Sequence, residues 1–252
     1  MPAPPSADDH ALAGSAATEA GALLVELRAE LFGSGQHPSL MGDIGDRQAH
    51  LFLLDLLTRE RPDDAVLSEE GRDDLARLSA ERVWIIDPVD GTREFSEPGR
   101  TDWAVHVALA IDGEAVAGAV ALPALGITLT TVPPPEPPPP HDGEPRILVS
   151  RSRPPFQARL IQEALGGQLV PMGSAGAKAM AVVRGEADVY AHAGGQYEWD
   201  NAAPTVVAAA AGLHVSRLDG SPLRYNQRDP WLPDLLICPH HLAEPVLQAL
   251  HG

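Results

Sequence analysis

The chain has 252 residues, 44% of them hydrophobic, and a formal net charge of −17. A surface this acidic repels nucleic-acid backbones and anionic membranes, so we expect neither polymeric nucleic acid nor a membrane among its partners. The sequence contains no run of eighteen apolar residues, which predicts a soluble globular protein.

The N-terminus and the single cysteine indicate the compartment. The first residues, "MPAPPSADDHALAG", do not place a basic segment before an apolar one, so they do not resemble a secretory signal. Cys238 lies in the apolar run "LLICP" and has no second cysteine with which to form an internal disulfide. We therefore expect a cytoplasmic protein in which Cys238 is a small buried side chain.

The first half of the chain is predicted to form helices followed by a sheet. Apolar residues recur at helical spacing, and Pro62 ends the second helix. Asp112-Gly113 is a strong hairpin signal between two of the strands. The expected helices are 11–33 and 46–60, and the expected strands are 65–68, 83–87, 102–111, 114–122 and 126–132.

A proline-rich segment, "PPPEPPPP" at 133–140, marks the boundary between two predicted domains, 1–140 and 141–252. Proline does not fit a central strand or a helix interior, so the segment is expected to be a stiff linker or exposed loop. Strands and helices then alternate, which predicts an α/β domain. Its expected strands are 146–150, 168–172, 187–192, 213–218 and 234–239, and its expected helices are 154–166, 174–184, 199–211 and one from about 241.

Acidic residues follow one of the buried strands closely. Asp87 and Asp90 come directly after an apolar run, with Pro88 turning the chain and Thr92 beginning a helical turn. Carboxylates this close repel each other unless a proton or a cation lies between them. Oxygen ligands with no Cys or His nearby favour Mg²⁺, with Mn²⁺ as a substitute, over zinc.

The same residues have a simpler interpretation. Asp-Pro and Asp-Gly are common turn dipeptides, and Asp200 begins an alanine-rich helix whose dipole favours a negative charge there. Glu69 and Glu70, however, lie at the end of another predicted strand. Three acidic groups at element ends favour one shared cation site over three separate turns.

Together these motifs resemble the inositol monophosphatase superfamily of Mg²⁺-dependent, lithium-sensitive phosphatases. The chain reads "SEEG" at 68–71, "DPVDGT" at 87–92 and "WDNAA" at 199–203, in the order found in that family. The resemblance runs from the first predicted helix to the last strand. It implies an α/β (α+β) fold, a layered α-β-α-β-α sandwich with an N-terminal antiparallel-sheet domain and a C-terminal α/β domain, and it implies a homodimer.

The resemblance also implies roles for individual residues. Two or three Mg²⁺ ions would be held by four carboxylates and one main-chain carbonyl, those of Glu69, Asp87, Val89, Asp90 and Asp200. Glu69 and Thr92 would orient the attacking water, and Asp46 would hydrogen-bond Thr92. Main-chain N–H groups of Gly91 and Thr92 would bind the phosphate. Many members carry a Thr two or three residues before the Asp46 position and a Lys further upstream, whereas this chain has Asp43-Ile44-Gly45 there and no Lys nearby.

Three stretches favour the 3′(2′),5′-bisphosphate nucleotidase group of this family. "DGTREF" keeps a cation at Arg93, "VSRSRPP" offers groups for a second phosphate, and "GSAGAK" resembles a loop beside the nucleotide. The substrate contacts this implies are Gly91, Thr92, Arg93, Ser150, Arg151, Ser152, Arg153, Ser174, Lys178 and Asp200. Alternatively, Arg93 is an exposed helix residue and the other two stretches are ordinary helix starts.

The sequence therefore predicts an enzyme that converts adenosine 3′,5′-bisphosphate to AMP and also accepts 3′-phosphoadenylyl sulfate, in connection with sulfate assimilation. An inositol-1-phosphate or fructose-1,6-bisphosphate phosphatase with the same metal site is the alternative. Two other classes of protein are disfavoured. A glycosidase using a carboxylate pair needs no phosphate-binding Gly-Thr, and a non-catalytic phosphate-binding module would be expected to have lost Thr92 or a metal ligand.

Overall fold

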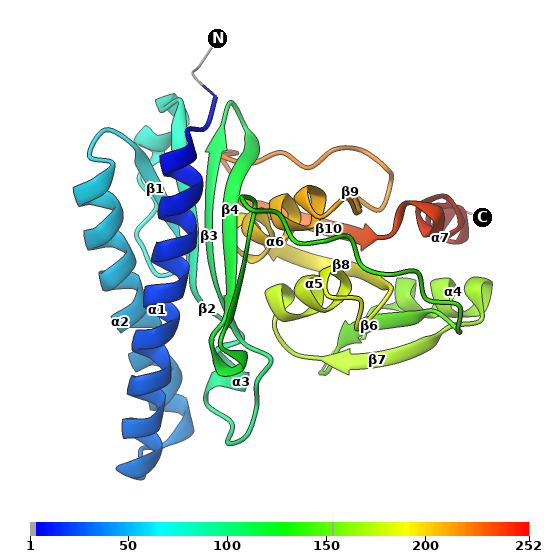
Figure 1. The fold of residues 1–252 in the computed structure, drawn as a ribbon, viewed down its shortest axis with the longest axis horizontal. Coiled ribbons are helices and arrows are strands. Elements are labelled where there is room, and N and C mark those ends of the chain that lie inside the picture. Colours follow the sequence, from blue (N-terminus) through cyan, green and yellow to red (C-terminus); the bar gives the residue numbers. More distant parts are fainter. Residues whose placement is uncertain (1–3, 153, 252) are drawn as a thin grey trace.

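The structure, a computed structural model, describes residues 4–152 and 154–251. Five layers of helices and sheets follow one another across the molecule (Figure 1). Helices α1 (Ala7–Gly33) and α2 (Pro38–Glu60) form the first layer, and α5 (Ala175–Val183) and α6 (Glu198–Ala210) lie between the two sheets. Helices α4 (Phe156–Leu165) and α7 (His240–His251) form the last layer. The predicted layered α-β-α-β-α sandwich is confirmed.

The first sheet has the strand order β1-β2-β3-β4-β5. Only β1 and β2 are parallel in it, and the other neighbours are antiparallel, as predicted for the N-terminal half. Its strands are β1 (Ala65–Ser68), β2 (Arg82–Asp90), β3 (Ala104–Ile111), β4 (Glu114–Leu122) and β5 (Ile127–Thr130). Short helices are η1 (Leu75–Ser79), α3 (Thr92–Phe95) and η2 (Pro123–Leu125).

The second sheet has the order β7-β6-β8-β10-β9 and mixes parallel and antiparallel pairs. Its strands are β6 (Arg146–Ser150), β7 (Gln168–Met172), β8 (Val189–Tyr197), β9 (His214–Ser216) and β10 (Trp231–Cys238). Strand β8 continues to Tyr197, five residues beyond the predicted end at His192. Cys238 is buried in β10, as expected.

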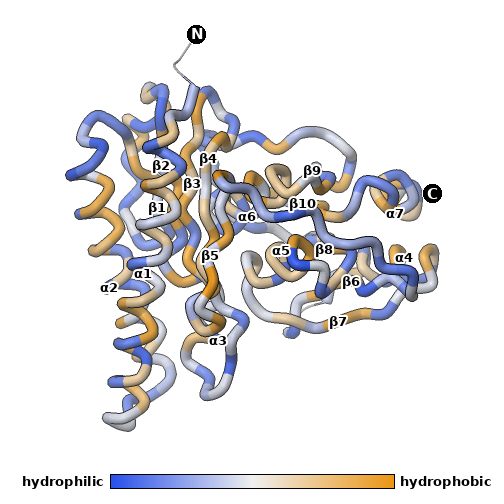
Figure 2. The backbone as a smooth tube through the Cα atoms, viewed as in Figure 1, coloured by the Kyte–Doolittle hydropathy of each residue, from blue (hydrophilic) through white to orange (hydrophobic). Residues whose placement is uncertain are grey.

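Side-chain alternation along the strands explains the layers. Trp84 and Ile86 of β2 point into a core shared with α1 and α2, whereas Val83 and Ile85 point to the opposite face. That second core includes side chains of α5, α6 and the second sheet, and a third core lies between the second sheet and α4 with α7. A strand buried on both faces needs apolar residues at every position, and Figure 2 shows this in the hydrophobic colouring of β2 and β3.

The backbone conformation confirms the predicted hairpin turn at Asp112-Gly113. Asp112 and Gly113 join β3 to β4 with φ values of 52° and 77°, the left-handed conformations that a two-residue hairpin turn needs. Helix α2 ends at Glu60, two residues before Pro62. None of the helices in the described ranges is both long and apolar enough to cross a membrane.

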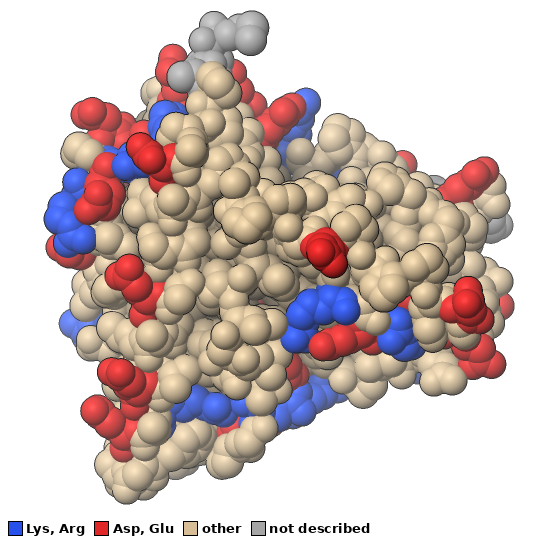
Figure 3. All heavy atoms as spheres, viewed as in Figure 1, with Lys and Arg blue, Asp and Glu red and all other residues tan. Residues whose placement is uncertain are grey.

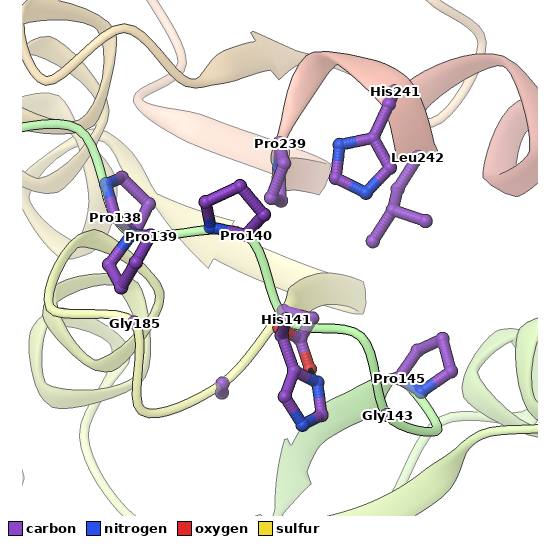
Figure 4. Close-up of a pocket in the computed structure, with 12 residues that line it drawn as sticks. Pro138, Pro139, Pro140, His141, Gly143, Pro145, Gly185, Pro239, His241 and Leu242 are labelled. Atoms are coloured by element: carbon purple, nitrogen blue, oxygen red, sulfur yellow. Dashed lines mark ion pairs between the residues drawn. The ribbon is translucent and has the colours of Figure 1, made fainter.

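The proline-rich segment joins β5 to β6 and hence the two sheets. Its prolines lie over the turn at Gly185 and, with His141, border a cavity of about 210 Å³ (Figure 4). His141 Nδ1 lies 3.2 Å from Asp188 Oδ2, which anchors the end of the segment to the start of β8. The segment therefore runs over the turns at Gly185 and Gly212 with most of its residues exposed, and the domain boundary at residue 140 remains a prediction.

Charged groups of both signs share the face shown in Figure 3. Acidic side chains occur in small groups, several of them beside Lys or Arg, and neutral side chains cover much of the area between. Basic side chains therefore partly offset the negative charge of the chain on this face.

Candidate active site

Three carboxylates meet where β2 ends beside the start of α6. One oxygen from each of Asp87, Asp90 and Asp200 lies within 4.8 Å of the other two. Main-chain groups fix two of them, because Asp200 Oδ2 accepts a 2.6 Å hydrogen bond from the Tyr197 N–H and Asp87 Oδ1 accepts one of 3.1 Å from the Val89 N–H. The sequence motifs that are far apart in the chain therefore converge.

Burial and mutual repulsion perturb these carboxylates. Burial raises the pKa of Asp87 well above its usual range, and the charges of Glu69 and Asp90 raise it further. Burial and then the Asp90 charge raise the pKa of Asp200 to about 6. The Glu69 side chain is exposed, yet loss of water around its carboxylate and the charge of Asp200 raise its pKa to about 7. Carboxylates that repel each other in this way release protons when a divalent cation binds.

Asp90 behaves differently because its carboxylate caps α5. Its oxygens accept hydrogen bonds from the Ala175 N–H at 3.0 Å, the Gly176 N–H at 2.6 Å and the Ser174 hydroxyl. Burial alone would raise the pKa of Asp90, but the charge and hydrogen bond of His106 and the bond from Ser174 together lower it to about 2. One carboxylate of the cluster is therefore ionised at neutral pH and joins the first sheet to α5.

Thr92 lies between two possible acceptors. Its Oγ1 is 3.1 Å from the Val89 carbonyl oxygen and 3.5 Å from Asp46 Oδ1, and its single proton bonds to one of them at a time. Burial, followed by the charges of Glu70 and Glu69, raises the pKa of Asp46 to about 8. Asp46 therefore binds a proton more readily than an ordinary aspartate, and its Oδ1 is one of the two acceptors within reach of the Thr92 hydroxyl.

Gly91 is required by its conformation and its surroundings. Its φ is 89°, in the left-handed region, and a Cβ there would lie 3.0 Å from Ser174 Cβ. The chain can consequently turn from β2 into α3 at Thr92, as predicted, while staying close to α5.

Two of the predicted basic contacts are bound to acidic side chains. Arg93 Nε lies 3.1 Å from Glu97, and the Arg93 side chain is 68% exposed. Arg151 lies 2.6 Å from Glu94 and 2.9 Å from Glu97. The structure therefore gathers these two arginines around Glu97, where a substrate phosphate would compete with a carboxylate for them.

The remaining predicted contacts lie on α5 and at the end of β6. Lys178 is buried, its Nζ donates a 2.5 Å hydrogen bond to the Ser174 carbonyl oxygen, and burial lowers its pKa. Ser150 Oγ and Ser152 Oγ lie 3.5 Å apart at the end of β6. Arg153 lies outside the described residues.

His106 belongs to this site although the sequence pattern did not single it out. Its ring is fully buried in β3, with Nε2 3.3 Å from Asp90 Oδ2 and Nδ1 3.0 Å from the Trp199 carbonyl oxygen. The one available signal was a histidine inside the apolar strand "WAVHVALA", where a polar side chain needs a partner. That partner comes from the motif residues Asp90 and Trp199.

Comparison with known proteins identifies the family. Residues 13–133 and 144–251 match the inositol monophosphatase family. This chain belongs to that family. It is 55% identical over 240 residues to the 3′-phosphoadenosine 5′-phosphate phosphatase of Mycobacterium bovis, covering 92% of this chain and 89% of the relative. It is 32% identical to the 3′(2′),5′-bisphosphate nucleotidase CysQ of Escherichia coli K12, covering 74% and 80%.

Solved structures agree with this assignment. Inositol monophosphatase II of Staphylococcus aureus superposes with a TM-score of 0.80, at 21% identity and 98% coverage of both chains, which concerns the fold alone. CysQ of Bacteroides thetaiotaomicron superposes with a TM-score of 0.77, at 26% identity, covering 92% of this chain and 97% of its own. The family uses divalent metals, and the carboxylates of Asp87, Asp90 and Asp200 form an acidic cluster suited to one.

Proposed function

We propose that this chain is a Mg²⁺-dependent phosphatase that removes the 3′-phosphate of adenosine 3′,5′-bisphosphate, also called 3′-phosphoadenosine 5′-phosphate, to give AMP. The observation that carries the proposal is the 55% identity, over 92% of the chain, to a protein named for that reaction. Agreement with CysQ, a bisphosphate nucleotidase by name, supports the same substrate class.

In this proposal the acidic cluster holds the cations. Glu69, Asp87, Asp90, Asp200 and the Val89 carbonyl would be the ligands, with Mn²⁺ as a possible substitute for Mg²⁺. Their fit rests on the donor set, since hard oxygen ligands suit a small divalent cation and one oxygen from each of Asp87, Asp90 and Asp200 lies within 4.8 Å of the other two. When bound, such cations lower the pKa of a water and neutralise charge on the phosphoryl and leaving oxygens.

The chain itself would orient the water and the phosphate. Thr92 would accept a hydrogen bond from the attacking water, while its own hydroxyl proton bonds to the Val89 carbonyl oxygen at 3.1 Å or to Asp46 at 3.5 Å. Glu69 would accept a second hydrogen bond from the same water and so fix its orientation. Main-chain N–H groups of Gly91 and Thr92 would bind the phosphate at the start of α3.

Contacts to the second phosphate and the nucleoside are proposed for the residues around α5 and the β6 loop. These are Arg93, Ser150, Arg151, Ser152, Ser174, Lys178 and the Asp200 carboxylate. Arg151 would exchange its bonds to Glu94 and Glu97 for bonds to phosphate, which is the bidentate recognition to which a guanidinium is suited.

Action on 3′-phosphoadenylyl sulfate, a link to sulfate assimilation, a cytoplasmic location and a homodimer are proposed as well. The alternative substrates are inositol-1-phosphate and fructose-1,6-bisphosphate, which the same metal site could serve. A glycosidase is disfavoured because the family consists of phosphatases by the names of its members found here.

The test is to incubate purified protein with adenosine 3′,5′-bisphosphate and Mg²⁺ and to follow the phosphorus resonances of both phosphates. We expect the 3′-phosphate resonance to be replaced by inorganic phosphate while the 5′-phosphate remains, and chelator to stop the reaction. Loss of the 5′-phosphate instead, or turnover that chelator leaves unchanged, would contradict the proposal.

A further inference from the structure

A stacked pair of aromatic rings lies next to the acidic cluster and has no part in the chemistry described so far. The rings of Tyr197 and Trp199 are nearly parallel, with an interplanar angle of 9° and centroids 4.8 Å apart. Trp199 packs against the core that lies between the two sheets, whereas the Tyr197 side chain is 45% exposed. One face of the tyrosine ring therefore covers the indole, and the other is open to solvent.

Single exposed aromatic residues are common on protein surfaces, so it is the position of this ring that suggests a role. Tyr197 is the last residue of β8 and its N–H donates the 2.6 Å hydrogen bond to Asp200 Oδ2. This bond holds the main chain of Tyr197 beside a carboxylate of the cluster. A molecule whose phosphate is held by a cation at Asp200 would therefore have Tyr197 as a close neighbour of its remaining atoms.

Contacts of Trp199 also hold the stacked pair in place. The Trp199 carbonyl oxygen accepts the 3.0 Å hydrogen bond of the buried His106 ring, and Trp199 lies in the first turn of α6. A ring fixed in this way loses little conformational entropy when a flat ligand stacks on it. The site thus offers a flat, preorganised, uncharged surface at the edge of a charged one.

We propose that Tyr197 is the stacking platform for the nucleobase of the substrate. The proposal rests on the proposed function, since among its candidate substrates the nucleotides carry a flat aromatic group and inositol phosphates and sugar bisphosphates do not. Stacking recognises the π-face shared by all bases, so Tyr197 selects base-bearing over base-free phosphate esters, with little preference among bases. This makes it a residue that determines specificity, separate from the residues that hold cations and phosphate.

The structure provides a clean variant. In Tyr197→Ala the main-chain N–H that bonds Asp200 is retained, so the metal ligand keeps its contact while the ring is lost. Tyr197→Phe keeps the ring, and Tyr197→Leu keeps apolar bulk without a π-face. Phe156→Ala is the matched control, because Phe156 is an exposed aromatic residue (68% exposed) on α4, in the last layer of the molecule.

Two substrates are compared in Mg²⁺: adenosine 3′,5′-bisphosphate and methyl ribofuranoside 3,5-bisphosphate, which lacks the base. We expect Tyr197→Ala and Tyr197→Leu to lose at least about fivefold in kcat/KM for the nucleotide and little for the base-free compound. Calorimetric binding of AMP should weaken by a similar factor. Tyr197→Phe and Phe156→Ala should stay close to the wild type in both measurements.

Equal losses for both substrates would mean that the ring only supports the fold, and unchanged nucleotide kinetics would place the base elsewhere. Either result overturns the assignment while the proposed function stands, as does a loss in Phe156→Ala equal to that in Tyr197→Ala. Failure of the wild type to hydrolyse the nucleotide, with inositol-1-phosphate hydrolysed instead, would reject the proposed function and this inference together.

Discussion

Replacing Gly176 by alanine tests how tightly α5 is packed against the candidate site. A Cβ at this position would lie 2.0 Å from His106 Nε2, about 1.4 Å inside the 3.4 Å of an ordinary contact. The imidazole cannot easily give way, because it is fully buried and its Nδ1 is bound to the Trp199 carbonyl oxygen. Either α5 or the ring must therefore shift.

The expected cost follows from this overlap. Overpacking of a buried site costs about 1–3 kcal/mol, and a clash with a fixed ring belongs at the upper end, so we expect a loss of about 3 kcal/mol. In a chain of this size that lowers Tm by about 6–12 °C. The Gly176 N–H is 2.6 Å from Asp90, so the shift also displaces a cluster carboxylate. Displacements of about 1 Å can cost about a hundredfold in rate, and we expect phosphate release to fall by at least tenfold.

Thermal unfolding and phosphate release of Gly176→Ala are compared with those of Gly33→Ala. Gly33 is a matched control because it ends α1 and a Cβ there meets nothing within 4 Å. Adding His106→Ala to Gly176→Ala should recover space, so the double variant should be no less stable than His106→Ala alone. A Gly176→Ala protein with unchanged Tm and activity, or with purely additive losses in the double variant, would refute this account of the packing.

Asp200→Asn should abolish phosphate release in a folded protein, because the amide oxygen still accepts the Tyr197 N–H while the charge that holds a cation is lost. Asp90→Asn should do the same and also lower Tm, and release near the wild-type rate by either variant would contradict the metal assignment. Lithium should inhibit at millimolar concentration in competition with Mg²⁺, because it is of similar size with half the charge, and equal responses to lithium and potassium chloride at matched ionic strength would count against the site. In chelator, the free energy of unfolding should fall as pH rises from about 4 to about 8, because Glu69 and Asp46, with folded pKa values of about 7 and about 8, bind protons more tightly when folded. Urea titrations at pH 5 and pH 8 measure this, and a more stable protein at pH 8 would show the sign to be wrong.

The layers of the fold were predictable because the strands and their turns have clear sequence patterns. Apolar residues at successive positions of "VWII" require burial on both faces, and Asp112-Gly113 suits one kind of turn. The end of β8 was not predictable in the same way. Gly194 and Gly195 interrupt the apolar pattern, so the strand looked finished at His192, although it continues to Tyr197. Pairing with β10, a contact made across 34 residues of sequence at Tyr197 and Trp231, extends it.

The candidate site also has a part that was predictable from sequence and a part that was not. The carboxylates Asp87, Asp90 and Asp200 were predictable because they belong to short motifs in a fixed order, and the structure brings them together. The partners of those carboxylates were not. His106 lies in a strand whose pattern predicts only burial, and what it contacts depends on where α5 and α6 pack. Which side chains bind the arginines around Glu97 likewise depends on tertiary contacts between the two sheets' loops.

The central claim is that this member of the family acts on a nucleotide bisphosphate. It is tested most directly by measuring kcat/KM in Mg²⁺ for adenosine 3′,5′-bisphosphate, inositol-1-phosphate and fructose-1,6-bisphosphate with one preparation of the protein. The account predicts the highest value for adenosine 3′,5′-bisphosphate, by at least about tenfold, since two phosphates and a stacked base all contribute binding in the transition state. A higher value for inositol-1-phosphate or fructose-1,6-bisphosphate would contradict it.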